Sequence, residues 1–545
     1  MIQETASPAA VENLERRFVG PVKIWELVFL VVFTAALLAT LVIQSRKEFF
    51  GHDELYVAIL TSNPSLSEML HTIRHGGETN PPLYYLLEWG VARVFGSGEL
   101  ALRAISGLSV ALAGWVLFFT IRPLGGPRVA ALAVALIFGL SRDVFVFMTM
   151  ARYYGLLLLL VALGAFLVIT LSGDRPVKRR DYWLIFLLHA SMIYVHLYGL
   201  FYSGVLFAAM VAVDWLRGRL RWGLYAVWVA AWATFLGWLP STLQQLKLVT
   251  SGVYTPPGYY TLGFFMEELA LQIPLAVILL LVVLLGGLAL LSARPCRAGE
   301  EAGSISTPIG WIALALVALA LMSVPVGTWL FSQVRQPPLY MRRYIFPCTT
   351  AWVLVVALML IAMLRLRLPG HSLRARVSPR FCELAWFSVL VFCVLFQPLR
   401  ARKNPGRPAQ AFTDEDYGYK NLPMVFEGSW GFVHRVVYGQ GRRYIVLIDQ
   451  AAAQASTGWY TKMMEVNFRA WHPRYQKAEI AHCADLPDEF LAVDDDTGKT
   501  FEWVFQHHSE FKTRLLGTQP ANPKELGEQR TYLVQRVPVA KDSAP

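Results

Sequence analysis

Long apolar runs separated by short polar loops dominate the chain from about residue 24 to residue 398. A helix needs about 20 consecutive apolar residues to cross the hydrocarbon core of a bilayer. Measured against that length, the pattern predicts an all-α polytopic membrane protein with about eleven transmembrane helices. The predicted segments are 24–44, 99–121, 128–147, 152–171, 182–196, 198–214, 222–240, 271–292, 308–331, 344–364 and 381–398.

Basic residues gather in alternate loops between these segments, and this spacing predicts the orientation. Cytoplasmic loops of membrane proteins carry an excess of Lys and Arg, so these loops and the N-terminus are expected in the cytoplasm. An odd number of helices then puts loop 45–98 and the polar tail on the external side. The basic loop residues are Arg122, Arg128, Arg175, Lys178, Arg179, Arg180, Arg217, Arg219, Arg221, Arg294, Arg297, Arg365, Arg367, Arg374, Arg376 and Arg380.

The apolar pattern ends near residue 399, where a tail rich in charge begins. Alternating segments in "RRYIVLID", "EFLAVDDDTGKTFEWVF" and "RTYLVQRV" predict strands, and "TGWYTKMMEVNFRAW" predicts a helix. Within the second segment, "DDDTGK" has the Asp and Gly residues of a hairpin turn and lacks the spacing of an EF-hand. We therefore expect a cytoplasmic segment at 1–23, a membrane domain at 24–398 and a small extracytoplasmic α/β domain at 399–545.

Loop 45–98 contains one further predicted helix, in "TSNPSLSEMLHTIR". Ser65 has the chemistry of a helix N-cap, and Leu66, Met69, Leu70 and Ile73 have the spacing of one helical face. Such a helix can lie on the bilayer surface, and it can equally be an ordinary amphipathic connector.

Composition agrees with the membrane class. Of the 545 residues, 55% are hydrophobic and only 16% are charged, which makes a water-soluble protein with one buried core a poor explanation. The formal net charge of +11 is accounted for by the basic loops, so nucleic acid is not an expected partner. The five cysteines form no CxxC pair, and neither a disulfide framework nor a zinc site is indicated.

Candidate chemistry begins with "GHDELY", where Asp53 and Glu54 follow the first predicted helix directly. Acidic side chains favour helix N-termini, so the pair can simply cap a helix. A positioned carboxylate can also act as a general base. The other motifs on the same predicted face, "GGETNPPLYYLLEW", "MTMARYYGL" and "QPPLYMRRYIFP", favour the second interpretation.

Arginines in two of these motifs add the opposite charge. Arg152, Arg342 and Arg343 lie at external helix ends, against the usual distribution of basic residues. Taken singly, each is explained by its long side chain reaching the interface. Arginine also binds phosphate well through its planar fork of donors. A carboxylate base and arginines on one face indicate a reaction whose leaving group is a lipid phosphate.

The ordered motifs resemble the bacterial type C (GT-C) membrane glycosyltransferases, which include protein mannosyltransferases, aminoarabinose transferases and rhizobial lipopolysaccharide sugar transferases. The resemblance covers residues 20–365. It rests on Asp-Glu after the first helix, then "NPPLYYLL", "FGSGELALRAISGLSVALAG", "ARYYGLLLLL", "YVHLYGLF", "GWLP" and "RRYIFP".

The resemblance implies a multi-pass enzyme of the bacterial inner membrane that needs no certain cofactor. It would move a sugar from a polyprenyl-phosphate carrier to a hydroxyl of a lipid, glycan or protein. By this resemblance Asp53 is the general base and Glu54 supports catalysis or binds the acceptor. The carrier phosphate would be bound by Arg152, Arg342 and Arg343, with Asn80, Tyr84, Tyr153 and Tyr154 as further binding residues.

Two positions depart from the pattern of that family. Many relatives have Glu two residues before the Arg of "ARYY", where this chain has Met150, and Asp143 stands seven residues too early to replace it. Relatives of the aminoarabinose type place Lys before the Pro-Pro pair, where this chain has the neutral Asn80. The second departure argues against a lipid A aminoarabinose transferase.

Three alternatives concern metal, transport and scaffolding. His52, Asp53 and Glu54 can each ligate a divalent ion, but adjacent residues of a helix or strand do not converge on one point. A transporter or flippase of lipid-linked sugars would show internal repeats and ionisable residues at mid-membrane. No clear repeat is visible, and the ionisable residues are concentrated outside the membrane, with His189, His196 and Asp214 as minor exceptions. An assembly scaffold would leave the Asp-Glu pair and the arginines without a shared role.

Overall fold

The structure is a computed structural model whose packing divides the chain into two compact units. The first contains residues 1–46, 103–237 and 256–405, and the second contains residues 47–102, 238–255 and 406–545. The structure describes residues 21–249, 263, 265–266, 308–334, 340–365, 379–406, 417–427, 429–439, 442–448, 469–471, 478–494, 500–519 and 528–537.

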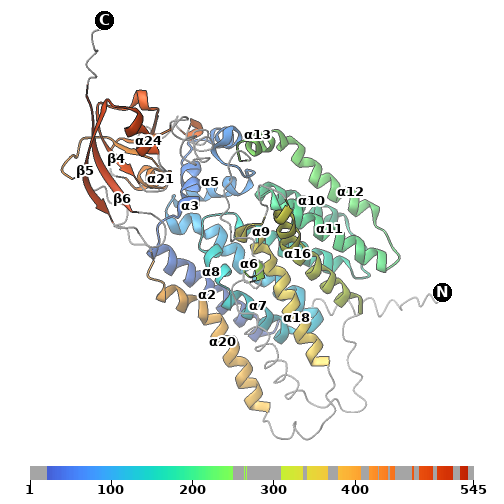
Figure 1. The fold of residues 1–545 in the computed structure, drawn as a ribbon. Coiled ribbons are helices and arrows are strands. Elements are labelled where there is room, and N and C mark those ends of the chain that lie inside the picture. Colours follow the sequence, from blue (N-terminus) through green and yellow to red (C-terminus); the bar gives the residue numbers. More distant parts are fainter. Residues whose placement is uncertain are drawn as a thin grey trace, which may run out of the picture. The chain divides into compact units, whose positions relative to one another are not determined.

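Helices make up the described part of the first unit (Figure 1). In chain order they are α2 (Ile24–Lys47), α6 (Glu99–Gly125), α7 (Pro127–Leu140), α8 (Arg142–Met148), α9 (Tyr154–Leu171), α10 (Arg179–Val195), α11 (Tyr198–Leu216) and α12 (Trp222–Ala233), followed by the 3-10 turn η2 (Thr234–Gly237). Then come α16 (Pro308–Val334), α17 (Arg342–Ile345), the 3-10 turn η3 (Phe346–Cys348), α18 (Thr349–Arg365) and α20 (Pro379–Lys403).

Among the described residues, seven helices are long and apolar enough to cross a membrane, or up to nine if two bent pairs each count as one span. The bent pairs are α7 with α8, at 72°, and α12–η2 with the start of α13 (Leu239–Val249). Each predicted transmembrane segment is helical in the structure, except 271–292, which lies outside the described residues. The polytopic class is confirmed, and the count of eleven stays a prediction.

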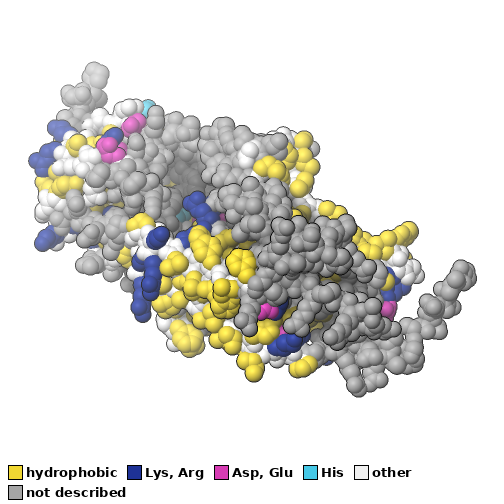
Figure 2. Space-filling view, turned by 90° about the horizontal axis from the view of Figure 1, so that it is seen from below, with side chains coloured by type: hydrophobic (Ala, Val, Ile, Leu, Met, Phe, Trp, Pro, Cys, Tyr) yellow, Lys and Arg dark blue, Asp and Glu magenta, His cyan; other side chains and the backbone are white. Residues whose placement is uncertain are grey.

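The helices of the first unit expose apolar side chains on their outer faces. Residues Ile24, Leu27, Val28 and Val31 of α2 are all more than half exposed, and their spacing places them on one helical face. Hydrophobic side chains form broad patches on the face shown in Figure 2. An exposed apolar face of this kind is typical of a helix in contact with lipid.

Close helix packing in this unit depends on a glycine of α7. An ideal Cβ at Gly139 would lie 2.1 Å from the backbone oxygen of Cys393 in α20. Beside it, the Gln397 side chain donates hydrogen bonds to the backbone oxygens of Phe138 and Ser141, each at 2.8 Å. The bond to Phe138 satisfies one of the carbonyls that the end of α7 leaves without a partner in its own helix.

We therefore expect Gly139→Ala to destabilise the protein, because the added carbon must push α7 and α20 apart. Overpacking of this kind costs about 1–3 kcal/mol. Thermal unfolding in detergent micelles measures the effect. The matched control is Gly204→Ala in α11, where an added Cβ meets nothing within 4 Å and alanine favours the helix. Equal melting temperatures for the two variants would contradict the close approach.

The second unit contains the helices of loop 45–98, namely α3 (His52–Thr61), α4 (Leu66–Thr72), the π-helical turn η1 (Ile73–Gly77) and α5 (Leu83–Phe95), together with α13. Ser65 caps α4, as predicted, by accepting a hydrogen bond from the Glu68 amide at 3.3 Å. The buried face of α4 contains Met69 and continues with Ile73 of η1, whereas Leu66 is exposed. Gly76 has φ +94°, a conformation that a residue with a Cβ rarely adopts.

The C-terminal α/β part of this unit is a six-stranded mixed sheet in the order β3-β2-β1-β4-β6-β5. The first four strands are parallel, and β6 and β5 are antiparallel to their neighbours. The strands are β1 (Met424–Phe426), β2 (Tyr444–Leu447), β3 (Ala478–Ala481), β4 (Glu489–Asp494), β5 (Phe511–Gln519) and β6 (Gln529–Arg536). Helix α21 (Ser429–Tyr438) connects β1 to β2, η5 (Cys483–Asp485) is a 3-10 turn, and α24 (Thr500–His507) precedes β5 (Figure 1).

Two of the strands predicted in the tail are confirmed, as β2 and β6, and one prediction is partly wrong. The first half of "EFLAVDDDTGKTFEWVF" is strand β4, but its second half is helix α24 and not the return strand of a hairpin. Phe501 and Val504 are buried at helical spacing, and the helix packs both side chains against the sheet. These tertiary contacts override the local preference of the segment for a strand. The predicted helix at 457–471 lies outside the described residues except for 469–471.

Candidate functional site

The acidic motif forms the first turn of α3, in the second unit. Gly51 precedes this helix in an extended conformation, and its amide donates to Oε2 of Glu54 at 2.7 Å. Glu54 is buried at 3% exposure, so it acts as a helix cap, one of the two interpretations left open by the sequence. Asp53 is half-buried beside it in the same turn.

Asn80 lies in the turn between η1 and α5, where Glu78 organises the chain. Oε1 of Glu78 accepts hydrogen bonds from the Thr79 amide at 2.8 Å and from the Asn80 side chain at 3.0 Å. Gln245 of α13 donates to the backbone oxygen of Glu78 at 2.9 Å and to that of Ile73 at 3.1 Å. The amide of Asn80 is therefore held in place by a carboxylate that the sequence pattern did not single out.

A further buried carboxyl group, Glu88, lies in α5 one turn after Tyr84. Both side chains have no exposed surface. Burial raises the pKa of Glu88 to about 8, the Tyr84 hydroxyl opposes that shift, and the charge of Glu54 adds to it. Helices α3 and α5 pack together, so the second unit holds Glu54 and Glu88 as a pair of neighbouring buried acids. At neutral pH Glu88 keeps its proton.

The three arginines predicted to bind the phosphate lie in the first unit, where two of them lie near His196. His196 stands between α10 and α11 and is buried at 3% exposure. Its ring stacks on Tyr153, with centroids 4.4 Å apart, and packs against Tyr344 at 4.7 Å. The guanidinium carbon of Arg152 lies 5.1 Å from the Tyr153 ring, and that of Arg343 lies 5.2 Å from the Tyr344 ring.

This arrangement places two positive charges around a neutral aromatic centre. Each guanidinium group lies beside a tyrosine ring that packs against His196. Nδ1 of His196 accepts a hydrogen bond from the Tyr198 amide at 3.1 Å, which assigns the proton of the neutral ring to Nε2. The group therefore combines two cations with an N–H donor, which is suited to an anion.

Arg342 has a different position from its neighbour Arg343. Its Nε donates to Oδ1 of Asp143 at 2.8 Å, and Asp143 is completely buried in the first turn of α8. Ser141 caps that helix by accepting from the Val144 amide at 3.2 Å. The ion pair ties α17 to α8, so Asp143, which stands too early for the acid position of the family motif, serves as a partner of Arg342.

Tyr84 and Tyr154 are both buried among aromatic rings. The Tyr84 ring lies 5.7 Å from Tyr85, edge to face. Tyr154 packs against Tyr153 at 4.5 Å and against Phe147 at 5.1 Å. The predicted residues thus form two groups: Asp53, Glu54, Asn80 and Tyr84 in the second unit, and Arg152, Tyr153, Tyr154, Arg342 and Arg343 in the first.

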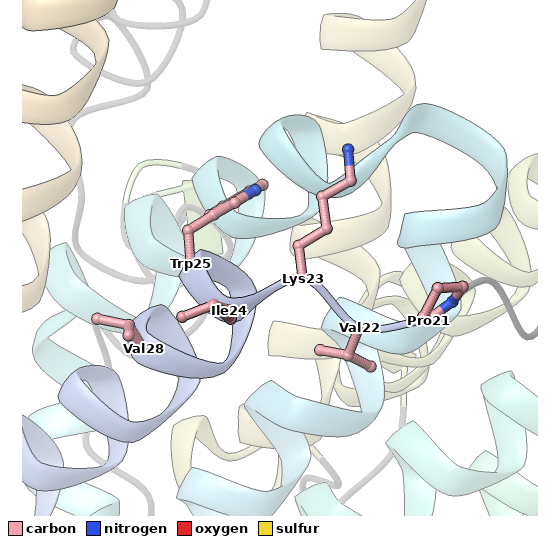
Figure 3. A pocket seen from close by; sticks show the side chains of 6 residues that line it. All are labelled: Pro21, Val22, Lys23, Ile24, Trp25 and Val28. Atoms are coloured by element: carbon pink, nitrogen blue, oxygen red, sulfur yellow. The ribbon is translucent and has the colours of Figure 1, made fainter.

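Neither metal-ligating side chains in the described residues nor the hollow shown in Figure 3 adds a residue to the candidate site. Within the described ranges, no group of three or more His, Cys, Asp or Glu side chains is placed to hold a metal ion. The hollow lies at the start of α2 and contains none of the predicted residues. Its lining is Pro21, Val22, Lys23, Ile24, Trp25 and Val28, an almost wholly apolar set without catalytic chemistry.

Sequence reasoning missed Glu88 and underrated His196. Glu88 is the one acidic residue in the apolar run "LYYLLEW", and its spacing of four from Tyr84 places both on one helical face. His196 belongs to "YVHLYGLF", a motif that was recognised, but its contact with "ARYY" and "RRYIFP" depends on the packing of three separate segments.

Comparison with solved structures identifies the fold. No protein-family model and no curated protein matches the chain. The crystal structure of apo ArnT from Cupriavidus metallidurans matches with a TM-score of 0.54 and 12% identity, over 93% of this chain and 97% of that one. ArnT bound to undecaprenyl phosphate matches with 0.50 and 13%, over 96% and 99%. The Archaeoglobus fulgidus oligosaccharyltransferase with Zn and sulfate gives 0.42 and 13%, over 76% and 62%.

The chain therefore has the fold of ArnT, in agreement with the fold that its ordered motifs predicted. More particularly, it is similar to ArnT over nearly its whole length, including the C-terminal α/β part. At 12–13% identity this likeness establishes the fold and leaves the chemistry to the chain's own residues.

Proposed function

We propose that this protein transfers a sugar from a polyprenyl-phosphate carrier to a hydroxyl group of a lipid, glycan or protein acceptor on the external side of the membrane. The observation that carries the proposal is the grouping of Arg152 and Arg343 around His196. The fold supports it, because ArnT has been solved with undecaprenyl phosphate bound.

The arginine group would bind the phosphate of the carrier. As the sugar leaves, the phosphate gains negative charge, and cations already in place stabilise that charge without reorganising. Arg152 and Arg343 supply the positive charge directly, and the Nε2–H of His196 adds a neutral hydrogen-bond donor. Arg342 acts indirectly, because its ion pair with Asp143 fixes the position of the first residue of α17, the helix that also contains Arg343.

Asp53 would act as the general base in the same step. The acceptor O–H bond breaks toward the Asp53 carboxylate, while the acceptor oxygen forms a bond to the anomeric carbon. The bond from that carbon to the phosphate oxygen breaks, and its electron pair stays on the phosphate. Glu54 supports the step by capping the turn that presents Asp53, and Asn80 is available for a sugar hydroxyl.

The proposal is tested by supplying purified protein in nanodiscs with a radiolabelled polyprenyl-phosphate sugar and membrane acceptors. A transferase converts the donor to free polyprenyl phosphate and a labelled acceptor. A flippase moves the donor across the bilayer and leaves its glycosidic bond intact. An unchanged donor in the presence of envelope acceptors would overturn the proposal.

Binding of undecaprenyl phosphate gives a separate test of the arginine group. We expect Arg343→Gln and Arg152→Gln each to weaken binding about ten- to a hundredfold, because a hydrogen bond to a charged group contributes about 1.5–3 kcal/mol. Arg343→Lys should retain part of the affinity, since it keeps the charge and loses the fork of donors.

The matched control for these variants is Arg179→Gln, which removes one exposed positive charge at the start of α10. Native mass spectrometry or a fluorescence competition assay in nanodiscs measures the affinities. If Arg179→Gln weakens binding as much as Arg343→Gln does, the charge of the protein as a whole binds the phosphate, and the arginine group is not its site.

A further inference from the structure

The last residue of α21, Tyr438, connects the C-terminal sheet to both ends of loop 45–98. Its hydroxyl accepts a hydrogen bond from the Phe50 amide at 3.0 Å and donates one to Oε1 of Glu99 at 2.8 Å. Its ring packs edge to face on Phe49, with centroids 5.0 Å apart. One phenol therefore contacts the chain three residues before Asp53 and again where α6 begins.

Trp471 makes a second connection, close to Asn80. Its indole N–H donates to the backbone oxygen of Gly77 at 3.1 Å, and its ring lies 4.8 Å from Tyr56 of α3. A Cβ at Gly77 would lie 2.6 Å from the Thr72 side chain and 3.1 Å from the indole nitrogen, so a larger residue would crowd this contact. Tyr56 in turn packs on His52, the residue before Asp53.

A third close approach joins the end of α2 to the start of the tail. Gly406 has φ +74°, and a Cβ there would lie 2.6 Å from the backbone oxygen of Lys47. Helix α21 also packs against α3 within the second unit (Figure 1). The loop is thus held where α3 begins, along α3 and at the turn before Asn80.

From these contacts we propose that the C-terminal domain is a clamp that positions the acidic loop, with Tyr438 and Trp471 as positioning residues for Asp53 and Asn80. The inference rests on the proposed transfer reaction for its catalytic consequence, but the clamp itself is defined by contacts within one unit. Helix α3 has only ten residues, too few to be stable in isolation. Tertiary contacts must hold it: Tyr438 accepts a hydrogen bond just before its start, and the ring of Trp471 packs on Tyr56 within it.

Hydrogen exchange of the full-length protein in nanodiscs tests the clamp without any assumption about catalysis. Tyr438→Phe keeps the ring and removes both hydrogen bonds, so exchange in peptides covering residues 48–54 should become about five- to tenfold faster. Trp471→Phe should have the same effect on peptides covering residues 74–80. Unchanged exchange in both regions would overturn the clamp.

The matched controls are hydroxyl and indole deletions elsewhere in the same domain. Tyr419→Phe removes a phenol that accepts from Arg514, and Trp503→Phe alters an indole stacked on His507. Neither should change exchange in loop 45–98. If these controls accelerate it as much as Tyr438→Phe does, the loop responds to the stability of the domain as a whole, and positioning by the two named residues is wrong.

Kinetics then distinguish positioning from support of the fold. Tyr438→Phe and Trp471→Phe should each lower kcat of sugar transfer about tenfold, while the affinity for undecaprenyl phosphate stays unchanged. Faster exchange with an unchanged kcat would overturn the positioning role. If exchange becomes faster in the variants but the wild-type protein transfers no sugar, the clamp is supported and the proposed function is refuted. The two failures are therefore distinguishable.

Discussion

Asp53→Asn is expected to reduce kcat for sugar transfer by about 10²–10⁴-fold, the usual contribution of a general base. The amide has nearly the same shape as the carboxylate but cannot accept the acceptor's proton. Affinity for undecaprenyl phosphate should stay unchanged, because the substitution leaves the arginine group that would bind the phosphate intact. Transfer assays and binding measurements on the same nanodisc preparation test both statements.

Two variants accompany Asp53→Asn. Asp53→Glu keeps a carboxylate on a longer side chain and should retain partial activity. Asp488→Asn removes an exposed carboxylate near the start of β4 and should leave transfer unchanged. A kcat for Asp53→Asn within a few-fold of the wild-type value would remove Asp53 as the base, whatever the binding result.

Glu88→Gln is expected to raise the melting temperature at neutral pH and to flatten its dependence on pH. Folded Glu88 keeps its proton up to about pH 8, whereas the unfolded chain loses it near the ordinary value of 4.5. Between these values the folded state binds more protons, so the free energy of unfolding falls as the pH rises. At pH 7 the accumulated loss is on the order of 3 kcal/mol, because each pKa unit corresponds to about 1.4 kcal/mol.

Glutamine resembles the protonated acid and does not ionise, so this loss should be absent in the variant. Thermal scanning in detergent from pH 5 to pH 8.5 should show a clear decline for the wild type and a smaller one for Glu88→Gln. Glu502→Gln replaces an exposed carboxyl group of α24 and serves as the control, with a wild-type profile expected. Parallel profiles for Glu88→Gln and the wild type would show that Glu88 is ionised in the folded protein.

The two variants separate the roles of neighbouring acids in one loop. Asp53 is half-buried and is expected to act on the substrate, whereas Glu88 is fully buried and is expected to affect stability. Glu54 lies between these cases, since it caps α3 and its charge raises the pKa of Glu88. Mutation of Glu54 should therefore disturb both properties at once and cannot by itself identify a catalytic role.

Several features of this protein could be predicted from the sequence because their causes are local. The helices followed from apolar runs of membrane-spanning length, and the start of α4 followed from the chemistry of Ser65. The strand prediction for residues 500–505 was wrong, because the spacing of Phe501 and Val504 suits a helix equally well and packing against the sheet selected the helix. The motif order was sufficient to predict the fold class, which the likeness to ArnT confirms.

The sequence by itself therefore determined the membrane class, the acidic turn with Asp53 and Glu54, and the arginines that are candidates for the phosphate. Only the tertiary structure decided that His196 joins Arg152 to Arg343, that Arg342 pairs with Asp143 across 199 residues, and that Trp471 reaches Gly77 across 394. The physical reason is range. Hydrophobic spacing and capping act within a few turns of chain, whereas these contacts depend on how separate helices pack, which no single segment encodes.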